Sequence, residues 1–191
     1  MTIGDTARAT TRWLVERWDG DQTAWLRRRS GLAAPVGDDF ARHKVRPFEV
    51  TEVHGNLVTT AGLGRQASLI IGAGGQAMTN TATRIGVGNG AGTAAVGDTD
   101  LSAAAGAANR WFQVMDATYP QQAAGVITLK ATFGGSDGNF NWTEFGIDIG
   151  APTVASGATV GALLYNHRTA IAQGTKANLQ IWAATATITY S

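Results

Sequence analysis

The chain has 191 residues, of which 44% are hydrophobic and 15% are charged, and its formal net charge is +1. Charged residues make up about a quarter of a typical soluble domain, so this composition favours either an assembly that covers part of the surface or a β-protein whose polar face consists of Thr, Asn and Gln. The sequence has no cysteine, which excludes disulfides, thiolate nucleophiles and cysteine-based metal sites.

Residues 1–45 differ in pattern from the rest of the chain, and the first helix is predicted there. Asp5 or Thr6 is a suitable N-cap, and Asp19 with the glycine after it breaks the helix. The residues at roughly helical spacing are Ala7, Ala9, Trp13, Leu14 and Arg17. A second short helix is expected from its cap at Asp21 to Arg29, followed by a loop.

Three of the six tryptophans fall in this segment, which is too short to bury them all alone. They either pack on the rest of the protein or dock into a partner, and we favour docking because Trp and Arg most often anchor interfaces. The only basic run is at residues 27–29. A solvated helix end is its default interpretation, and an acidic partner face or nucleic acid is the alternative. The partner-binding candidates are Trp13, Trp18, Trp25, Arg27, Arg28 and Arg29.

From about Val45 onward the apolar residues recur with a period of two, which is typical of half-buried strands. The clearest strands are residues 127–133 and 182–190. Further strands are expected at residues 48–53, 68–71, 84–87, 111–117 and 144–149. A short helix is expected to begin within residues 56–64, and one or two helical turns within residues 98–108.

Short strands separated by turns rich in Gly, Asn and Asp predict a mainly β fold without βαβ units. We predict an antiparallel β-sandwich, of the jelly-roll or Ig-like kind, over residues 46–191. Residues 1–45 are then expected to form a helical or extended attachment arm.

Residues 69–77 (LIIGAGGQA) have the outline of a dinucleotide-binding turn, a strand followed by G-x-G-x-x-A. That motif needs a helix directly after the glycines, because the helix N-terminus holds the pyrophosphate. The next strand is expected at Arg84, which leaves no room for such a helix. We therefore interpret residues 72–75 as a loop between strands and expect no cofactor.

The sequence nominates no catalytic or metal-ligating residue. The three histidines, His43, His54 and His167, stand apart from one another and from carboxylates at ligand spacing. Carboxylates in the loops, at Asp98, Asp100 and Asp137, lack the pattern of a dedicated calcium loop and fit turn chemistry better.

Glu144 lies between Trp142 and Phe145, where aromatic neighbours can raise the pKa of a carboxyl group for acid catalysis. Without a second carboxylate beside it, we interpret Glu144 as a paired strand residue. A protein that is not an enzyme is therefore expected.

Several strings of residues 50–191 resemble a family of small virion proteins of tailed phages. They are GNLVTTAGL at 55–63, LIIGAGGQA at 69–77, RIGVG at 84–88, AAVGDTDL at 94–101, MDATYP at 115–120, TF at 132–133, NFNWTEFGI at 139–147, LLYNHR at 163–168 and GTK at 174–176. A closing Thr-rich strand completes the pattern. Residues 1–45 are not part of it.

The resemblance implies a virion structural role, on the capsid surface as a decoration or head-fibre protein, or in the tail as a minor tail protein. The expected partners are other virion proteins, either the major capsid protein or tail proteins, and further copies of this chain, with a trimer as one fitting symmetry. The expected location is the virion, assembled in the host cytoplasm. A carbohydrate-binding module of a tail or baseplate is the alternative.

Membrane and nucleic acid are not expected as partners. No apolar run approaches the roughly 20 residues of a membrane helix, and the first residues lack the basic-then-apolar order of a signal peptide. The small net charge does not favour nucleic acid either.

Overall fold

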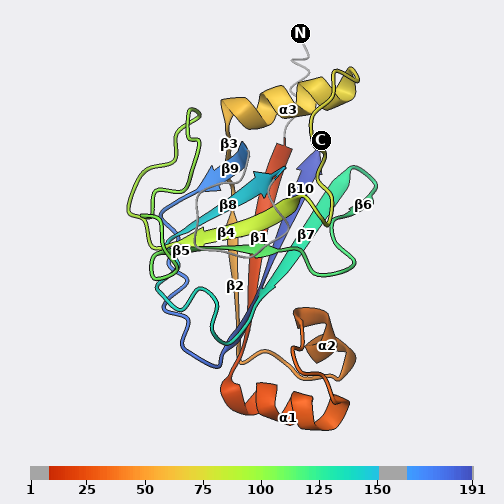
Figure 1. Cartoon of the computed structure of the whole chain (residues 1–191), viewed down its shortest axis with the longest axis vertical. Helices are drawn as coiled ribbons and strands as arrows, with labels where there is room; N and C mark the ends of the chain where they lie inside the picture. Colours follow the sequence, from red (N-terminus) through yellow and green to blue (C-terminus); the bar gives the residue numbers. More distant parts are fainter. Residues whose placement is uncertain (1–8, 151–162, 191) are drawn as a thin grey trace, which may run out of the picture.

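The computed structural model describes residues 9–150 and 163–190, which form two antiparallel five-stranded sheets packed face to face (Figure 1). The first sheet has the order β2 (Glu49–His54), β1 (Ala9–Trp18), β10 (Ile181–Tyr190), β7 (Val126–Phe133) and β6 (Gln121–Ala123). The second has the order β3 (Leu57–Val58), β9 (Leu163–Arg168), β8 (Glu144–Ile149), β4 (Thr83–Gly88) and β5 (Arg110–Val114). The predicted antiparallel β-sandwich is confirmed.

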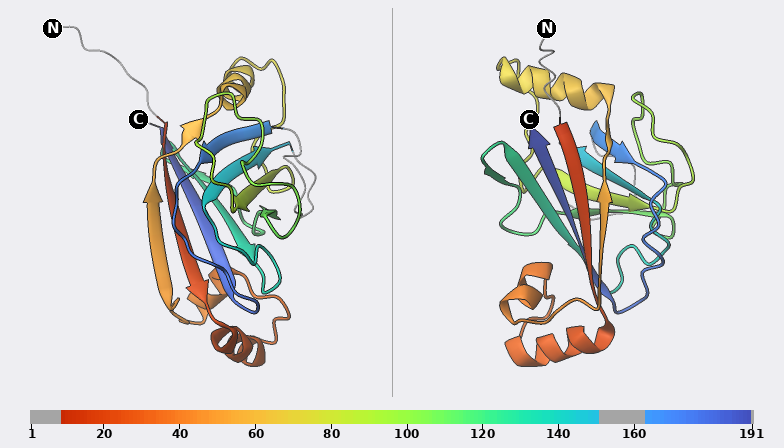
Figure 2. Two further views of the ribbon diagram at one scale, coloured as in Figure 1. Left: turned by 90° about the vertical axis from the view of Figure 1, so that its left-hand side faces the viewer. Right: turned by 180° about the vertical axis from the view of Figure 1, so that it is seen from behind.

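The helices lie at the two ends of the sandwich. The helices α1 (Gly20–Ser30) and α2 (Gly37–Arg42) lie together at one end, and α3 (Thr60–Ile70) lies across the other (Figures 1 and 2). The two helical regions therefore give the molecule two distinct poles.

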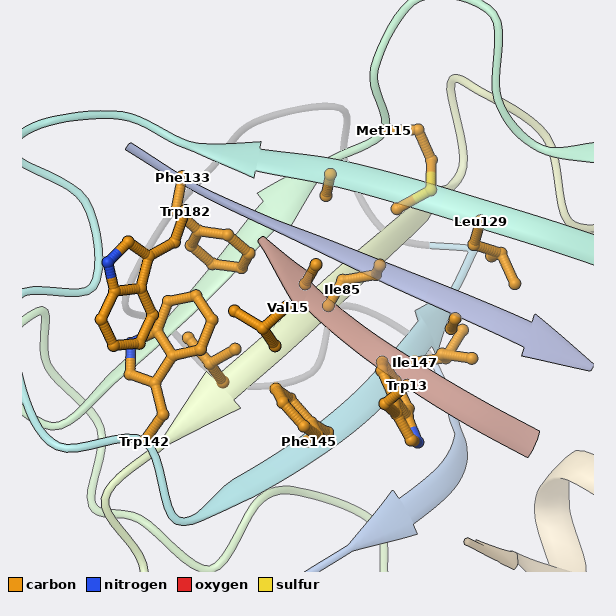
Figure 3. Packing of buried hydrophobic residues seen from close by; sticks show 14 of the residues in the cluster. Trp13, Val15, Ile85, Met115, Leu129, Phe133, Trp142, Phe145, Ile147 and Trp182 are labelled. Atoms are coloured by element: carbon orange, nitrogen blue, oxygen red, sulfur yellow. The ribbon is translucent and has the colours of Figure 1, made fainter. Parts of the chain in front are cut away.

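The hydrophobic core fills the space between the sheets and is rich in aromatic rings (Figure 3). The alternation predicted for β7 and β10 turns every second side chain inward, and Phe133 pairs with Trp182 across the two strands. The Trp142 ring lies edge-on to both, with centroids 4.7 Å from Phe133 and 4.8 Å from Trp182. Such pairs contribute about 0.5–1.5 kcal/mol each beyond the burial of their area, so these ring contacts stabilise this corner of the core.

Residues 9–18 form a strand of the sandwich, so the helix predicted there is wrong; its predicted cap at Asp5 or Thr6 lies outside the described residues. β1 lies between β2 and β10; it pairs with β10 from Ala9 to Trp18 and with β2 from Arg12 to Arg17. Its inward face carries Thr11, Trp13, Val15 and Arg17, which are nearly or fully buried. The burial therefore follows a period of two, and the helix-like spacing of apolar residues did not decide the structure. Because β1 is an internal strand of the first sheet, residues 9–18 are not an attachment arm, and the β-domain does not begin at residue 46.

The second predicted helix is confirmed as α1, although its cap is Asp19 and not Asp21. The Asp19 carboxylate accepts a hydrogen bond from the Gln22 amide at 2.8 Å, and the Gln22 side chain accepts one from the Asp19 amide at 3.1 Å. This reciprocal capping box satisfies two amides at the start of the helix. Gly31 ends the helix in the left-handed conformation.

α3 replaces the strand predicted at residues 68–71, which form its last turn and the residue after it. The helix predicted to begin within residues 56–64 does begin there, because the Thr59 hydroxyl caps it by accepting from the Gly62 amide at 2.9 Å. A short apolar run is compatible with a helix end as well as with a strand. Here the N-cap at Thr59 starts a helix that continues through this run. Residues 98–108 contain turns and bends instead of the helical turns predicted there.

Gly62 allows α3 to lie against β9. A Cβ atom at this position would stand 2.3 Å from the carbonyl oxygen of Tyr165. Gly62→Ala is therefore expected to destabilise the fold by about 1–3 kcal/mol, the usual range for overpacking, measured by urea unfolding. Gly64→Ala is the matched control, since nothing lies within 4 Å of a Cβ there and alanine favours a helix by up to about 1 kcal/mol. Equal effects of the two substitutions would contradict the close packing of α3 on β9.

Candidate functional site

The structure separates the residues predicted to bind a partner into a buried pair and an exposed group. Trp13 is fully buried and stacks on Phe145, with ring centroids 4.7 Å apart. Trp18 is 1% exposed and stacks on Phe40 with a centroid distance of 4.4 Å. The prediction that Trp13 and Trp18 dock into a partner is therefore wrong, because both pack within the chain itself.

Trp25 and the three arginines that follow it are accessible. The Trp25 side chain is 46% exposed, and the residues at 27–29 lie exposed in the last turn of α1. Basic groups at a helix C-terminus interact favourably with its dipole. These four residues remain candidates for binding a partner.

A surface hollow of about 580 Å³ lies beside Trp25, at the pole formed by α1, α2 and residues 43–46, which we call the helical end. Its lining combines aromatic, aliphatic and charged groups. The lining residues are Asp21, Gln22, Ala24, Trp25, Arg28, His43, Lys44 and Val45.

The hollow has a rigid base. Trp18 fixes the strand side of it, because its indole N–H donates to the Val45 carbonyl oxygen at 3.1 Å. On the other side, the side-chain amide of Gln22 donates to the Arg46 carbonyl oxygen at 2.8 Å. A small cluster of Trp18, Leu26, Phe40 and strand residues packs beneath. The shape of the hollow is thus set before any partner binds.

The helical end is locally basic. Residues 20–48 contain six Lys or Arg and three Asp, a formal charge of +3, whereas the whole chain has +1. Two of these acids are already paired: Asp38 lies 2.8 Å from the Lys130 ammonium and Asp39 lies 2.8 Å from Arg42. Within residues 9–150 and 163–190, five cations of this end have no ion pair: Arg27, Arg28, Arg29, Lys44 and Arg46. The surface therefore presents positive charge to a partner.

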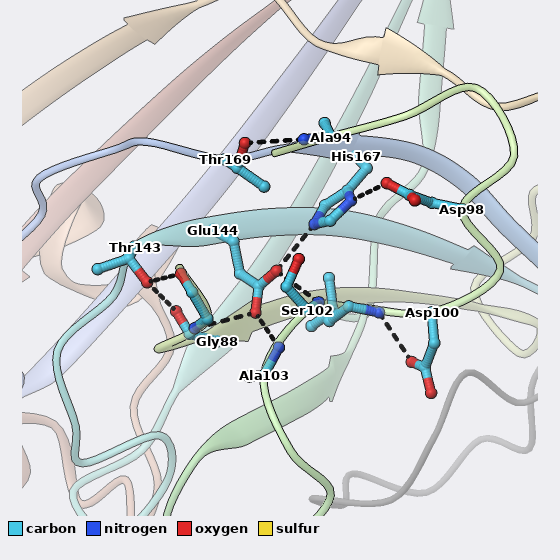
Figure 4. Close-up of polar contacts among 12 residues, drawn as sticks. Gly88, Ala94, Asp98, Asp100, Ser102, Ala103, Thr143, Glu144, His167 and Thr169 are labelled. Carbon is cyan, nitrogen blue, oxygen red and sulfur yellow. Dashed lines mark hydrogen bonds and ion pairs between the residues drawn. The ribbon is translucent and has the colours of Figure 1, made fainter. Parts of the chain in front are cut away.

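A second polar cluster, around His167 on β9, was not foreseen from the sequence (Figure 4). The His167 ring is 1% exposed and lies between two carboxylates. Its Nε2 is 2.8 Å from Glu144 and its Nδ1 is 2.6 Å from Asp98. The expectation that each histidine stands apart from carboxylates is therefore wrong for His167, and also for His54, whose Nε2 lies 2.6 Å from Glu52 at the surface.

Glu144 joins this cluster to a long loop of the chain. One of its carboxylate oxygens accepts from the amides of Gly90 and Ala103, at 3.2 and 2.8 Å, and the other from the Ser102 amide at 2.8 Å. Glu144 is a strand residue, as predicted, but its side chain is fully buried and holds the loop between β4 and β5 against the second sheet.

The electrostatics favour an imidazolium between two carboxylates. Burial lowers the pKa of His167, but the hydrogen bonds to Glu144 and Asp98 outweigh burial and raise that pKa above its usual value. Burial raises the pKa of Glu144, and the hydrogen bonds from His167 and from the loop amides lower it by more. Burial raises the pKa of Asp98 as well, but the hydrogen bonds from the Ala95 amide and from His167, together with the charge of His167, lower it by more.

This cluster is poorly arranged for catalysis. General base catalysis needs a ring nitrogen within reach of a nucleophile or water. Both nitrogens of His167 face carboxylates, and the Glu144 carboxylate is buried under the loop. The arrangement instead links β8, β9 and the loop, so its physical effect is structural.

The remaining motifs from the sequence have structural explanations too. The glycines at residues 72–75 follow the C-terminal end of α3, so they neither join two strands nor precede a helix that could hold a phosphate. Asp98 and Asp137 accept from amides three residues away, Ala95 and Gly134, as expected of turn chemistry. Among the described residues, no group of three or more His, Asp or Glu is placed to hold a metal ion.

No helix in the described part of the chain is long and apolar enough to cross a membrane. Comparisons with protein-family models, with curated proteins and with solved structures find no match to this chain.

Proposed function

We propose that this chain is a non-enzymatic structural protein of a tailed-phage particle, located on the capsid surface as a decoration or head-fibre protein. The sequence strings of residues 50–191 that resemble small virion proteins support the class of particle. The antiparallel sandwich is compatible with the same class, because a compact β-domain can serve as a surface protein that is present in many copies on a particle.

The observation that carries the proposal is the helical end. It combines a half-exposed tryptophan, a preformed hollow and five cations without an ion pair among the described residues. Trp and Arg dominate the binding energy of protein interfaces. The attachment role expected of residues 1–45 thus passes to α1 and the turn at residues 43–46, while β1 belongs to the sandwich.

The test is incorporation into particles of the phage that encodes this chain. Particles would be purified on a density gradient, heads and tails separated, and each fraction quantified by mass spectrometry. The chain is expected in the head fraction. Its presence in tails alone would move the proposal to the tail, and its absence from both fractions would refute a virion role.

A double variant tests the attachment surface. Trp25→Ser with Arg28→Glu is expected to lower the copy number per particle by about tenfold or more, because it removes the aromatic anchor and reverses a charge. Arg12→Gln is the matched control, since Arg12 is also an exposed cation but lies on β1, away from the helical end. Wild-type incorporation of the double variant would show that another surface attaches the protein.

A further inference from the structure

The charge and shape of the helical end identify the kind of partner it fits. We infer that the hollow beside Trp25 binds an acidic segment of another protein, with carboxylates paired to Arg28 and Lys44 and an apolar side chain laid on the Trp25 indole. This inference rests on the proposal that the helical end is the attachment surface, and it adds the chemistry of the partner.

The cations face the hollow from two elements. Arg28 comes from the last turn of α1 and Lys44 from the turn after α2, and both line the same hollow. Because each lacks an ion pair among residues 9–150 and 163–190, their charges are available to carboxylates of a partner. A guanidinium also binds carboxylates through two parallel hydrogen bonds, which orients the bound segment.

The backbone at Lys44 is a second observation. Lys44 has φ 58°, the left-handed conformation that glycine adopts readily and that other residues adopt at a cost. The turn is held by hydrogen bonds from the Lys44 amide to the Ala41 carbonyl and from the Val45 amide to the Phe40 carbonyl. The chain thus places a long cationic side chain where glycine would fit with less strain, and that side chain lines the hollow.

The apolar part of the lining favours a protein segment over nucleic acid. Trp25, Ala24 and Val45 offer a surface on which an apolar side chain can be buried. Asp21 is part of the same lining and repels any anion, so a chain whose charges are spaced fits better than a backbone with a phosphate at every nucleotide. A polypeptide with spaced carboxylates satisfies both features, because it supplies apolar contacts and separate negative charges.

The test is fluorescence anisotropy with the full chain and a short fluorescein-labelled peptide of repeated Glu-Phe-Glu-Gly. The peptide is expected to bind, and to bind more weakly as salt is raised, since the screening length falls from about 10 Å at 0.1 M to about 3 Å at 1 M. The same peptide with Gln in place of Glu is expected to bind at least about tenfold more weakly. Tighter binding of a single-stranded oligonucleotide of mixed sequence would overturn the inference in favour of nucleic acid.

Variants locate the binding. Lys44→Gly removes the cation, and glycine readily adopts the left-handed backbone at this position, so the variant is expected to stay folded. Lys44→Gly and Arg28→Gln are each expected to weaken binding about fivefold, and Trp25→Ser about thirtyfold. Arg12→Gln is expected to leave the affinity unchanged. If the three variants at the helical end bind like wild type, the inference is wrong.

The peptide and the particle experiments can fail separately. A chain that binds the acidic peptide through Trp25 but is absent from particles would refute the virion role alone. A chain that is present in particles but does not bind the peptide would refute the acidic partner alone.

Discussion

A chain that starts at residue 20, without β1, is expected not to fold. β1 pairs with β10 on one side and with β2 on the other, so its removal leaves β2 with no partner strand among the described residues and exposes the edge of β10. It also removes the buried Trp13, Val15 and Trp18 side chains. Truncating one buried Trp costs about 3–5 kcal/mol, and a whole domain has only about 5–15 kcal/mol of stability.

Circular dichroism and urea unfolding check this prediction. The truncated chain is expected to lack a cooperative unfolding transition, and Trp13→Ala in the full chain is expected to lose about 3–5 kcal/mol. Trp25→Ala is the matched control, because Trp25 is half exposed and its truncation should cost less than about 1 kcal/mol. A cooperative transition in the truncated chain would instead restore the interpretation of the N-terminal residues as an arm.

The sandwich was predictable where apolar side chains recur at every second position of a strand. Residues 144–149 were predicted as a strand and match β8 (Glu144–Ile149), and the alternation of β7 and β10 matches their pairing. β1 was mistaken for a helix because its inward-facing positions include the polar Thr11 and Arg17. The apolar residues alone therefore do not show the period of two. Arg17 is buried because its guanidinium lies 4.4 Å from the Trp182 ring centroid and donates to Gln173. Such a partner, 156 residues away, is not visible locally.

The candidate sites also differ in how far they could be predicted, because one is built from neighbours in the sequence and the other is not. Trp25 and the following arginines could be predicted to lie together at the surface because they are neighbours on one helix. Lys44 and His43 could not be predicted to join them, since the turn after α2 brings them to the hollow. Glu144, His167 and Asp98 come from β8, β9 and a loop, so no local spacing reveals that they meet.

Glu144→Gln is expected to destabilise the fold by about 3 kcal/mol, the usual effect of breaking a buried ion pair. Glutamine has the same size, but only one of its terminal atoms accepts hydrogen bonds. Glu144 accepts four hydrogen bonds, three from loop amides and one from His167, on two oxygens. The NH₂ group of the glutamine therefore faces N–H donors with which it cannot form a hydrogen bond. His167 keeps Asp98 as the one carboxylate beside it in the cluster. Amide hydrogen exchange at Gly90, Ser102 and Ala103 is expected to accelerate.

The destabilisation by Glu144→Gln is expected to depend on pH, and the shifted pKa values of His167 and Glu144 determine where it is largest. The pKa of His167 is raised above 6.5, so its contribution is fully present below pH 6.5 and is lost as pH rises through the raised value. The pKa of Glu144 is lowered below 4.5, so its contribution is present above pH 4.5 and is lost as pH falls through the lowered value. The difference in stability between wild type and Glu144→Gln should thus be largest between about pH 4.5 and 6.5.

Urea unfolding of both proteins across this range separates the cluster from other titrating groups. Burial raises the pKa of Asp116 to about 6, which changes the stability of both proteins alike and cancels in the difference. His54→Gln is the matched control, because the His54 side chain is 74% exposed beside Glu52 and its loss should leave the profile unchanged. A difference between wild type and Glu144→Gln that stays constant from pH 4.5 to well above 6.5 would mean that His167 is neutral in the folded protein. The cluster would then hold the loop by hydrogen bonds alone, without the ion pair that the short contacts to both carboxylates indicate.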